Sequence, residues 1–321
     1  MMDKVWMKYK YKYKTRNLFH KPLCNYAGKK IINIERTNQV ISSYIQTGKE
    51  FMVGRFGATE MQVLVSFLQK KHFPYIDNTR YYVKKLCDLS GFFPNDIKYG
   101  ERFAELLLES CKMIDLCGAW NLNMEEYVLD VYASQALITH LDYLEPWRMD
   151  NKIIKPWSHA LKGKRVLVIH PFSETISHQY ALYRERIFSP RLEANDILPK
   201  FELKTLQAVQ SLNCNIENVN FRNWFEALKY MQDECTKIDF DVAIIGCGAY
   251  GFPLAAFVKQ IGKGAIHLGG ATQILFGIMG KRWETGEYHQ ILSQYINEYW
   301  TRPLESEKPK KADNIEGGCY W

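Results

Sequence analysis

The sequence predicts an α/β protein built on a doubly wound, mostly parallel, Rossmann-like sheet with a helical insertion. Short unbroken apolar runs, which are typical of strands buried on both faces of a parallel sheet, alternate along the chain with helix-length segments. Glycine-bearing turns follow several of these runs directly, as they do where a strand leads into a helix. The chain has no internal repeat, so this alternation favours one wound sheet over a repeat architecture.

Length and composition set the domain organisation that we expect. The 321 residues allow one large α/β domain or two small ones, and 47% hydrophobic residues indicate a globular core. We predict a basic aromatic arm over 1–30, a single α/β domain over 31–300 and a C-terminal tail over 301–321. The tail is rich in Pro, Lys and Glu and is expected to be loosely ordered, while its aromatic end, Tyr320-Trp321, is expected to fold back onto the body.

The net charge of +7 belongs to the arm. Residues 1–30 hold nine Lys or Arg against one Asp, which leaves 33 positive and 34 negative residues, a net charge of −1, for the rest of the chain. This neutral body argues against nucleic-acid binding. In the arm, lysine and tyrosine alternate over 8–14 without a hydrophobic face. We expect residues 1–20 either to meet an anionic membrane surface, with aromatic rings at headgroup level, or to form a solvated, partly disordered terminus.

The cysteine pattern and the hydropathy of the chain indicate the cellular compartment that we expect for the protein. The eight cysteines form no C-x-x-C pair and no metal-finger spacing, and no signal peptide is recognisable. Reduced thiols in a cytoplasmic protein are the simplest expectation. No apolar run reaches the roughly 18 residues that a membrane span needs. We therefore expect a cytoplasmic protein, peripheral at the inner face of the membrane if the arm binds there.

The first strand-to-helix turn lies between a short strand at 51–53 and an amphipathic helix at 61–71. Arg55 and Glu60 flank this turn. An arginine there can bind phosphate, and a carboxylate can bind a metal ion or a sugar hydroxyl. The alternative is an Arg–Glu ion pair that stabilises the turn, with Glu60 at the helix start for dipole reasons, and spacing alone favours that alternative.

Residues 72–150 are expected to be largely helical, with helix-forming segments over 101–114 and 125–141. The frequent aromatic residues of this region are expected to pack in the core or at its rim. No residue in it is predicted to carry chemistry.

The clearest strand in the middle of the chain, 164–169, ends in His170-Pro171-Phe172-Ser173-Glu174. If the strands are parallel, His170 and Glu174 lie at the same sheet edge as the glycine turns. Such a His–Glu couple could act as a general base. The alternative is a histidine at a strand end that is hydrogen-bonded for structural reasons.

The most informative stretch, 239–283, joins two strands and two helices by glycine turns. The run Val242–Ile245 is followed at once by GCGAYG and a helix, and the next strand, 265–268, ends in a Gly-Gly pair. Both turns fall at the carboxyl ends of neighbouring strands, where ligands bind in open α/β sheets, and free N–H groups at helix starts favour phosphate. We therefore predict a nucleotide site that contains Gly246, Gly248, Tyr250, Gly251, Gly269 and Gly270.

The GCGAYG turn also matches the G-x-G-x-x-G pattern of dinucleotide-binding proteins. That pattern is completed by an acidic residue about 20 residues further on, which binds the ribose, but here the next strand ends near His267 with no Asp or Glu nearby. The missing acidic residue argues against a Rossmann-type oxidoreductase or methyltransferase, which the glycine pattern alone leaves as one alternative. A second is that the glycines serve only close strand–helix packing.

Three short segments resemble the GT-D type glycosyltransferases of bacterial surface polysaccharide, capsule and glycoprotein glycan assembly. Residues 55–60, RFGATE, are similar to that family's R-[FI]-G-D-G-E turn, 166–174 to its middle strand and loop, and 244–269 to its glycine loop, helix and A-I-D-L-G strand. The resemblance implies a GT-D-like sheet. It also implies an enzyme of the hexosyltransferase type, which moves a sugar from a nucleotide-sugar, usually UDP-linked, onto a bacterial surface glycan or lipid-linked acceptor.

The resemblance further implies a D-x-E pair acting with a divalent metal, Mn²⁺ or Mg²⁺, at the donor diphosphate. Glu60 is the remaining carboxylate of that pair and the expected metal ligand, because the family's Asp falls on Ala58, and a second family Asp falls on His267. With two carboxylates missing, we expect cations to neutralise the diphosphate instead, with Arg55 and the pair Lys281-Arg282 as candidates.

The predicted site therefore has two parts. Its catalytic residues are Glu60, His170 and Glu174. The residues expected to bind the nucleotide-sugar donor are Arg55, Gly57, His267, Lys281 and Arg282 together with the six residues of the glycine turns. The non-enzyme alternative, a polysaccharide-assembly protein that has lost its activity, is favoured by the two missing carboxylates.

Overall fold

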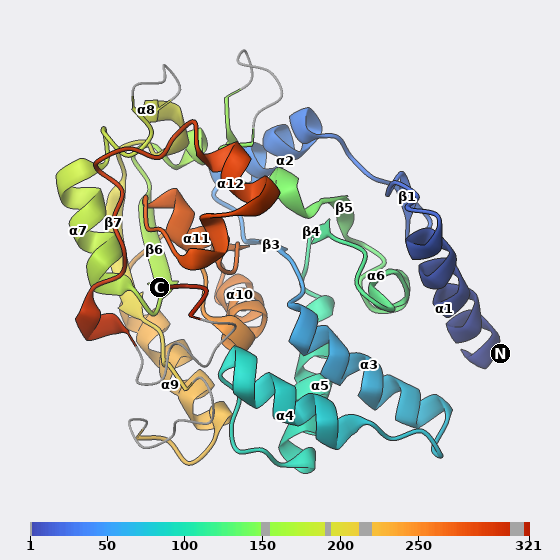
Figure 1. Ribbon diagram of the computed structural model, residues 1–321. Helices are drawn as coiled ribbons and strands as arrows, with labels where there is room; N and C mark the ends of the chain where they lie inside the picture. Colours follow the sequence, from blue (N-terminus) through green and yellow to red (C-terminus); the bar gives the residue numbers. More distant parts are fainter. Residues whose placement is uncertain (1, 149–154, 190–193, 212–219, 309–317) are drawn as a thin grey trace.

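The structure, a computed structural model, describes all residues except 1, 149–154, 190–193, 212–219 and 309–317. Its centre is a seven-stranded sheet in which every paired strand is parallel to its neighbour (Figure 1). This confirms the predicted doubly wound sheet. The strand order is β5-β4-β3-β9-β8-β6-β7, with bounds β3 Phe51–Gly54, β4 Leu116–Ala119, β5 Leu137–His140, β6 Arg165–His170, β7 Glu202–Gln207, β8 Val242–Ile245 and β9 Gly264–His267.

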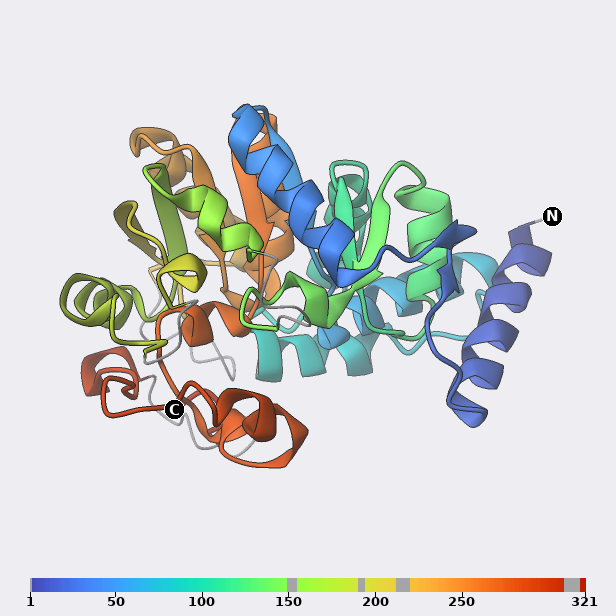
Figure 2. The same cartoon turned by 90° about the horizontal axis from the view of Figure 1, so that it is seen from above.

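Helices cover both faces of this sheet (Figures 1 and 2). The side chains between sheet and helices form two hydrophobic cores. Side chains alternate between the cores along each strand: Met52 belongs to the first, and Phe51 and Val53 belong to the second. The first core contains residues of α3 Ala58–His72, α4 Thr79–Ser90, α5 Ile97–Cys111, α6 Glu125–Tyr132, α9 Trp224–Lys237 and α10 Gly251–Gln260. The second contains residues of α2 Ile34–Thr47, α7 Ser173–Tyr183, α8 Ala194–Ile197, α11 Ala271–Leu275 and α12 Gly286–Leu292.

The winding of the chain opens a crevice at one edge of the sheet. After β3 and β8 the chain leaves toward the helices of the first core, and after β6 and β9 it leaves toward those of the second. The four strands are neighbours, so their connections diverge at the shared carboxyl edge. In open α/β sheets, ligands bind where connections diverge in this way.

Two strands lie inside 72–150, the region predicted to be largely helical. The helix predicted over 125–141 ends at Tyr132, and β4 and β5 extend the sheet on that side. The strand β4 reads Leu-Cys-Gly-Ala, and a Cβ at Gly118 would lie 2.7 Å from the Leu144 side chain. Small residues selected by such close packing have low strand propensity, which explains why the sequence pattern missed this strand.

The N-terminal residues form α1, Met2–Leu18, which packs against α6. Trp6 and Tyr9, three positions apart on this helix, are 1% and 4% exposed, with ring centroids 5.0 and 6.0 Å from that of Tyr127. Arg16 pairs with Glu126 at 3.0 Å. The expectation of a terminus without an apolar face is therefore wrong for the described residues, because one Trp and one Tyr at helical spacing supply that face.

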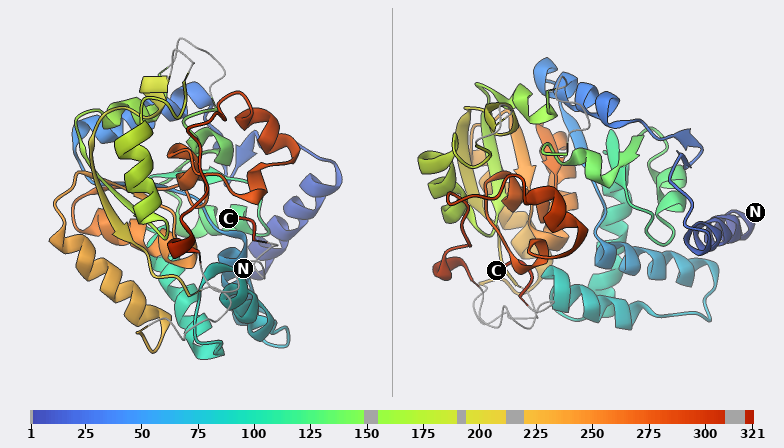
Figure 3. Two further views of the ribbon diagram at one scale, coloured as in Figure 1. Left: turned by 60° about the vertical axis from the view of Figure 1, so that its left-hand side comes forward. Right: turned by 45° about the horizontal axis from the view of Figure 1, so that its top comes forward.

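The described parts of the C-terminal tail also pack against the body (Figure 3). At the start of α7, Glu307 is 5% exposed and accepts hydrogen bonds from the backbone N–H groups of Glu174 and Thr175 at 2.7 and 3.2 Å. Trp321 is 7% exposed. The expectation of a loosely ordered tail is wrong for 301–308 and 318–321, and the predicted return of the aromatic end is confirmed.

Two further findings concern the described part of the chain. None of its helices is both long and apolar enough to cross a bilayer. Its seven described cysteines are all free, and all except Cys24 are buried.

Candidate functional site

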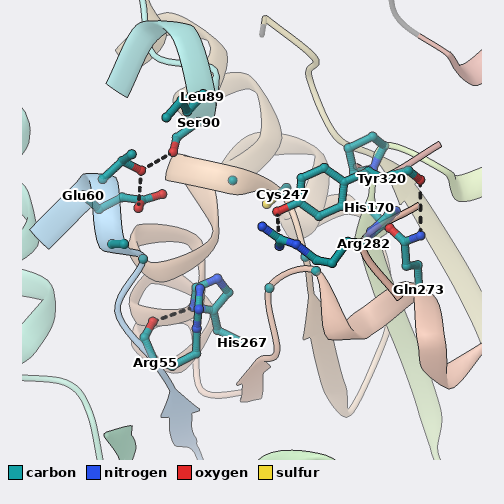
Figure 4. Close-up of a pocket in the computed structure, with 18 of the residues that line it drawn as sticks. Arg55, Glu60, Leu89, Ser90, His170, Cys247, His267, Gln273, Arg282 and Tyr320 are labelled. Atoms are coloured by element: carbon teal, nitrogen blue, oxygen red, sulfur yellow. Dashed lines mark hydrogen bonds between the residues drawn. The ribbon is translucent and has the colours of Figure 1, made fainter. Parts of the chain in front are cut away.

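A cavity of about 210 Å³ lies at the carboxyl edge of the sheet, over the ends of β3, β9, β8 and β6 (Figure 4). Its walls come from the turns after these four strands, from the end of α4 and from the C-terminal Tyr320-Trp321. Among the residues that line it are ten of the predicted site: Arg55, Gly57, Glu60, His170, Gly246, Gly248, His267, Gly269, Gly270 and Arg282.

Four predicted residues do not line this cavity: Glu174, Tyr250, Gly251 and Lys281. The Glu174 side chain is exposed in the first turn of α7, so His170 and Glu174 do not form the expected couple. The Tyr250 ring is buried and stacks on Trp224 at 4.9 Å. Gly251 makes room for an imidazole, because a Cβ there would lie 2.3 Å from His267 Nε2.

Arg55 carries the clearest indication of an anionic ligand. Its guanidinium lies over the Trp120 ring at 4.7 Å, and its Nε is buried with no hydrogen-bond partner among the described residues. Burial lowers the pKa of this guanidinium, while the charge of Glu60 acts in the opposite direction. The ion pair expected with Glu60 is not formed, nor does any other described carboxylate pair with Arg55. The residue as a whole is half-buried, and a guanidinium without a carboxylate partner among the described residues suits an anionic ligand.

A second guanidinium, that of Arg282, lines the same cavity. Its Nη1 donates a hydrogen bond to the Tyr320 hydroxyl at 2.8 Å, and its Cζ lies 4.8 Å from that ring's centroid. Between the arginines, Gly269 has φ +62°, and a Cβ there would lie 3.3 Å from Arg55 Nη1. Glycine at 269 therefore lets the guanidinium lie against the backbone.

Two neutral histidines line the cavity, and they differ in whether Nε2 carries the proton or the lone pair. His170 Nδ1 accepts a hydrogen bond from the backbone N–H of Phe172 at 3.0 Å, which leaves the proton on Nε2. His267 Nδ1 lies 3.1 Å from the Arg55 carbonyl oxygen and must donate to it, which leaves the lone pair on Nε2. Burial lowers the pKa of each imidazole to about 3. His170 is therefore a hydrogen-bond donor and not the general base that the sequence predicted.

Glu60 is the one carboxylate among the residues that line this cavity. It stands in the first turn of α3 and is 8% exposed. Its Oε2 accepts a hydrogen bond from the Thr59 hydroxyl at 2.9 Å, and that hydroxyl is also hydrogen-bonded to Ser90 Oγ (Figure 4). A Cβ at Gly57 would collide with the Glu60 carboxylate, so the glycine allows the acid to curl back over the start of the helix.

The glycines of the GCGAYG turn approach other parts of the protein. A Cβ at Gly246 would lie 2.4 Å from the Gly269 carbonyl oxygen, and one at Gly248 would lie 2.7 Å from the Ser90 carbonyl oxygen. These contacts favour the alternative in which the two glycines serve close packing within the protein. The neighbouring Cys247 thiol is buried, which raises its pKa, so it is not poised as a nucleophile.

A Gly248→Val variant is therefore expected to lose stability in addition to any effect on ligands. Its φ of +55° is strained for a branched residue, and the backbone oxygen of Ser90 cannot move aside as a flexible side chain would. The left-handed conformation alone costs about 1–3 kcal/mol for a non-glycine residue. Urea denaturation of the variant checks this loss. Wild-type stability would mean that the two segments separate easily.

Sequence reasoning missed several residues that line the cavity, among them Ser90, Trp120, Gln210, Gln273 and Tyr320. Gln210 Nε2 and Gln273 Oε1 are buried without a hydrogen-bond partner among the described residues. Unpaired buried polar atoms call for a ligand or water. A prediction of β4 would have pointed to Trp120, which directly follows that strand. The sequence predicted that Tyr320 returns to the body but not that it lines the cavity, and no sequence signal marks Gln210.

The loop that holds Trp120 is fixed by a buried acid that sequence reasoning also passed over. Glu125 is fully buried, and its Oε2 accepts hydrogen bonds from the Trp120 and Leu122 backbone N–H groups at 3.2 and 3.1 Å and from the Tyr26 hydroxyl at 2.9 Å. Burial raises the pKa of this carboxyl to about 7. The ring beneath Arg55 is thus held by contacts that reach the N-terminal segment.

The residues present do not form a metal site by themselves. The described part of the chain contains no group of three or more His, Cys, Asp or Glu residues placed to hold an ion. Hard divalent ions take six or more oxygen ligands, and Glu60 is the single acidic side chain among the described residues that line this cavity.

Comparison with protein-family models finds no match, and comparison with curated proteins finds none either. Among solved structures, the chain is similar to one described as "The highly conserved domain of unknown function 1792 has a distinct glycosyltransferase fold". The two share 12% sequence identity at a TM-score of 0.41, over 85% of this chain and 95% of that one.

Proposed function

We propose that the protein is a glycosyltransferase that takes a sugar from a nucleoside-diphosphate sugar, in the first place a UDP-sugar, and transfers it to a hydroxyl group of a bacterial surface glycan or lipid-linked acceptor. The observation that carries this proposal is the guanidinium of Arg55, which has no hydrogen-bond or ion-pair partner among the described residues and lies in a cavity at the carboxyl edge of a parallel sheet. Arg282 adds a second positive charge. Two arginines suit a diphosphate because guanidinium groups bind phosphate oxygens with paired, charge-assisted hydrogen bonds.

The proposed transfer forms a bond from the acceptor oxygen to the anomeric carbon and breaks the bond from that carbon to the diphosphate oxygen. The electron pair leaves with the diphosphate, whose growing charge Arg55 and Arg282 stabilise. The acceptor proton passes to Glu60, the carboxylate of the cavity. His170 donates its Nε2–H to the donor, and the Thr59 hydroxyl holds the Glu60 carboxylate in place.

A divalent metal is proposed to enter this site only with the donor. Because Glu60 acts as the base, Mn²⁺ or Mg²⁺ would take its ligands from phosphate oxygens and water. We therefore propose weak metal binding by the free protein.

A thermal-shift screen tests the proposed function. UDP, dTDP, GDP and ADP, each with a matching nucleotide-sugar and with or without Mn²⁺, are compared with NAD and S-adenosylmethionine. A ligand at about 100 times its dissociation constant stabilises the folded protein by about 2.7 kcal/mol, and we expect such a shift for at least one nucleotide-sugar. A shift with NAD or S-adenosylmethionine alone would favour the Rossmann-type alternative. Binding without transfer or donor hydrolysis would favour an inactive assembly protein.

The outward face of α1 supports a second proposal, that the protein docks on anionic membrane surfaces. Met7, Tyr11 and Leu18 lie on this face at 53%, 70% and 72% exposure, and exposed lysines accompany them at Lys4, Lys8 and Lys14. Aromatic and aliphatic side chains beside lysine suit the headgroup region of a bilayer.

Charge reversal on this face is expected to abolish binding to anionic liposomes. Each lysine near the surface contributes about 1 kcal/mol, so a Lys4→Glu, Lys8→Glu, Lys14→Glu variant should no longer pellet with them at low salt. Deleting residues 1–20 is a poorer test, because it removes the buried Trp6.

The control carries the same charge change away from α1, with Lys84→Glu and Lys229→Glu on α4 and α9 and Lys112→Glu directly after α5. It is expected to pellet like the wild type. Equal pelleting of both triple variants would contradict the proposed role of α1.

A further inference from the structure

A second cavity, of about 180 Å³, adjoins the first. Arg55, Gly270, Arg282 and Tyr320 line both, so the two guanidinium groups belong to the boundary between the cavities. Each cavity alone is smaller than the roughly 300–1,000 Å³ of typical small-molecule sites. Together they fall within that range, which favours one ligand that spans both.

The second cavity has the chemistry of a carbohydrate site. Glu145, 7% exposed, accepts hydrogen bonds from the Tyr288 hydroxyl and from Arg148 Nε, the latter at 2.6 Å. A carboxylate has about four lone-pair positions, so it can accept further bonds from ligand hydroxyls. The Arg148 guanidinium offsets its charge.

Apolar surface completes this cavity. The rings of Trp283, Tyr288 and Tyr320 line it together with Leu141, Leu144 and Leu268. A sugar ring has hydroxyl groups on its rim and C–H bonds on its faces. Its hydroxyls match the buried Glu145 acceptor, and its faces match the aromatic rings.

The first cavity suits a nucleoside instead. Its lining includes two aromatic side chains, Trp120, which carries the Arg55 guanidinium on its face, and Trp321. It also includes the amide side chains of Gln210 and Gln273, which carry one donor and one acceptor atom without a partner among the described residues, the groups that recognise the polar edge of a base.

We propose that the second cavity is the subsite for the glycosyl group of the donor, with the nucleoside in the first cavity and the diphosphate between them on Arg55 and Arg282. This assignment rests on the proposed function and adds which residues recognise the sugar. The bond that breaks in transfer then lies beside the two arginines, where the leaving charge is stabilised most effectively.

Two alanines in equivalent positions allow the two cavities to be tested separately. Ala271 lines only the second cavity and Ala58 only the first. Both are half-buried, and each is the first residue of a helix after a glycine N-cap. An Ala271→Phe or Ala58→Phe substitution therefore fills one cavity from an equivalent backbone position.

Calorimetric titration of the full chain with UDP and with UDP-glucose, UDP-galactose and UDP-N-acetylglucosamine tests the assignment. Ala271→Phe is expected to weaken binding of the preferred UDP-sugar at least tenfold and to change UDP affinity less than twofold. Ala58→Phe is expected to weaken both. If Ala271→Phe does not fold, as judged by its melting transition, Leu141→Phe narrows the same cavity from a different segment.

Two results would overturn the subsite: equal weakening of UDP and UDP-sugar by Ala271→Phe, or an unchanged affinity for both. The first would mean that the nucleotide itself occupies the second cavity, and the second that no donor group enters it. A wild-type protein that binds neither UDP nor any UDP-sugar would contradict the proposed donor itself. The two failures are thus distinguishable.

Discussion

An Arg55→Met variant is expected to lose nucleotide binding by about 100-fold or more while melting at or above the wild-type temperature. Hydrogen bonds to a charged group contribute about 1.5–3 kcal/mol each, and a guanidinium that binds two phosphate oxygens makes at least two. Methionine keeps the length and apolar stem of the side chain. It also removes a half-buried charge that no described carboxylate pairs with, and replacing a partly desolvated charge by apolar atoms is often neutral or stabilising. Calorimetric titration and thermal melting measure both effects.

Arg165 provides the matched control. It lies at the start of β6, at the opposite edge of the sheet, and its Nη2 pairs with Asp241 at 2.6 Å. Arg165→Met is expected to lower stability and to leave nucleotide affinity unchanged, the reverse of Arg55→Met. If Arg55→Met unfolds the protein or binds nucleotide as the wild type does, Arg55 serves the fold and not a ligand.

A Glu60→Gln variant is expected to lose turnover by about 10²–10⁴-fold, the contribution of a positioned general base, with little change in melting temperature. Glutamine keeps the shape of the side chain and can still accept the Thr59 hydrogen bond, but it cannot take up the acceptor proton. Sugar transfer, or donor hydrolysis as a substitute, is measured across a Mn²⁺ titration.

Two companion variants sharpen this test. Glu174→Gln changes a carboxylate that is exposed and outside the cavity, and it is expected to be fully active. Ala58→Asp adds a second carboxylate two positions before Glu60 and is expected to tighten Mn²⁺ binding. Full activity of Glu60→Gln would show that Glu60 only stabilises the start of α3, as the helix-dipole alternative holds.

The parts of the fold that the sequence predicted share one physical property. The strands at 165–170 and 242–245 are buried on both faces and therefore read as unbroken apolar runs. The strand β4 is equally buried, but its glycine is selected by the space beside Leu144. That selection depends on a residue distant in sequence, so no local pattern could reveal the strand.

The candidate site follows the same division. The rule that parallel strands end at one edge brought Arg55, Glu60, His170 and the glycine turns together. It failed for Glu174, because four residues along the chain carry it past the strand end and into the exposed first turn of α7. It gave no access to Tyr320, which reaches the cavity from the end of the chain through packing on Arg282.

The most direct test of the proposed function is an experimental structure of the protein with a bound nucleotide-sugar. The expected result is the diphosphate within hydrogen-bond distance of Arg55 Nε and Arg282, with the base over the first cavity and the sugar beside Glu145. A donor bound elsewhere, with the Arg55 guanidinium still unpaired, would contradict it.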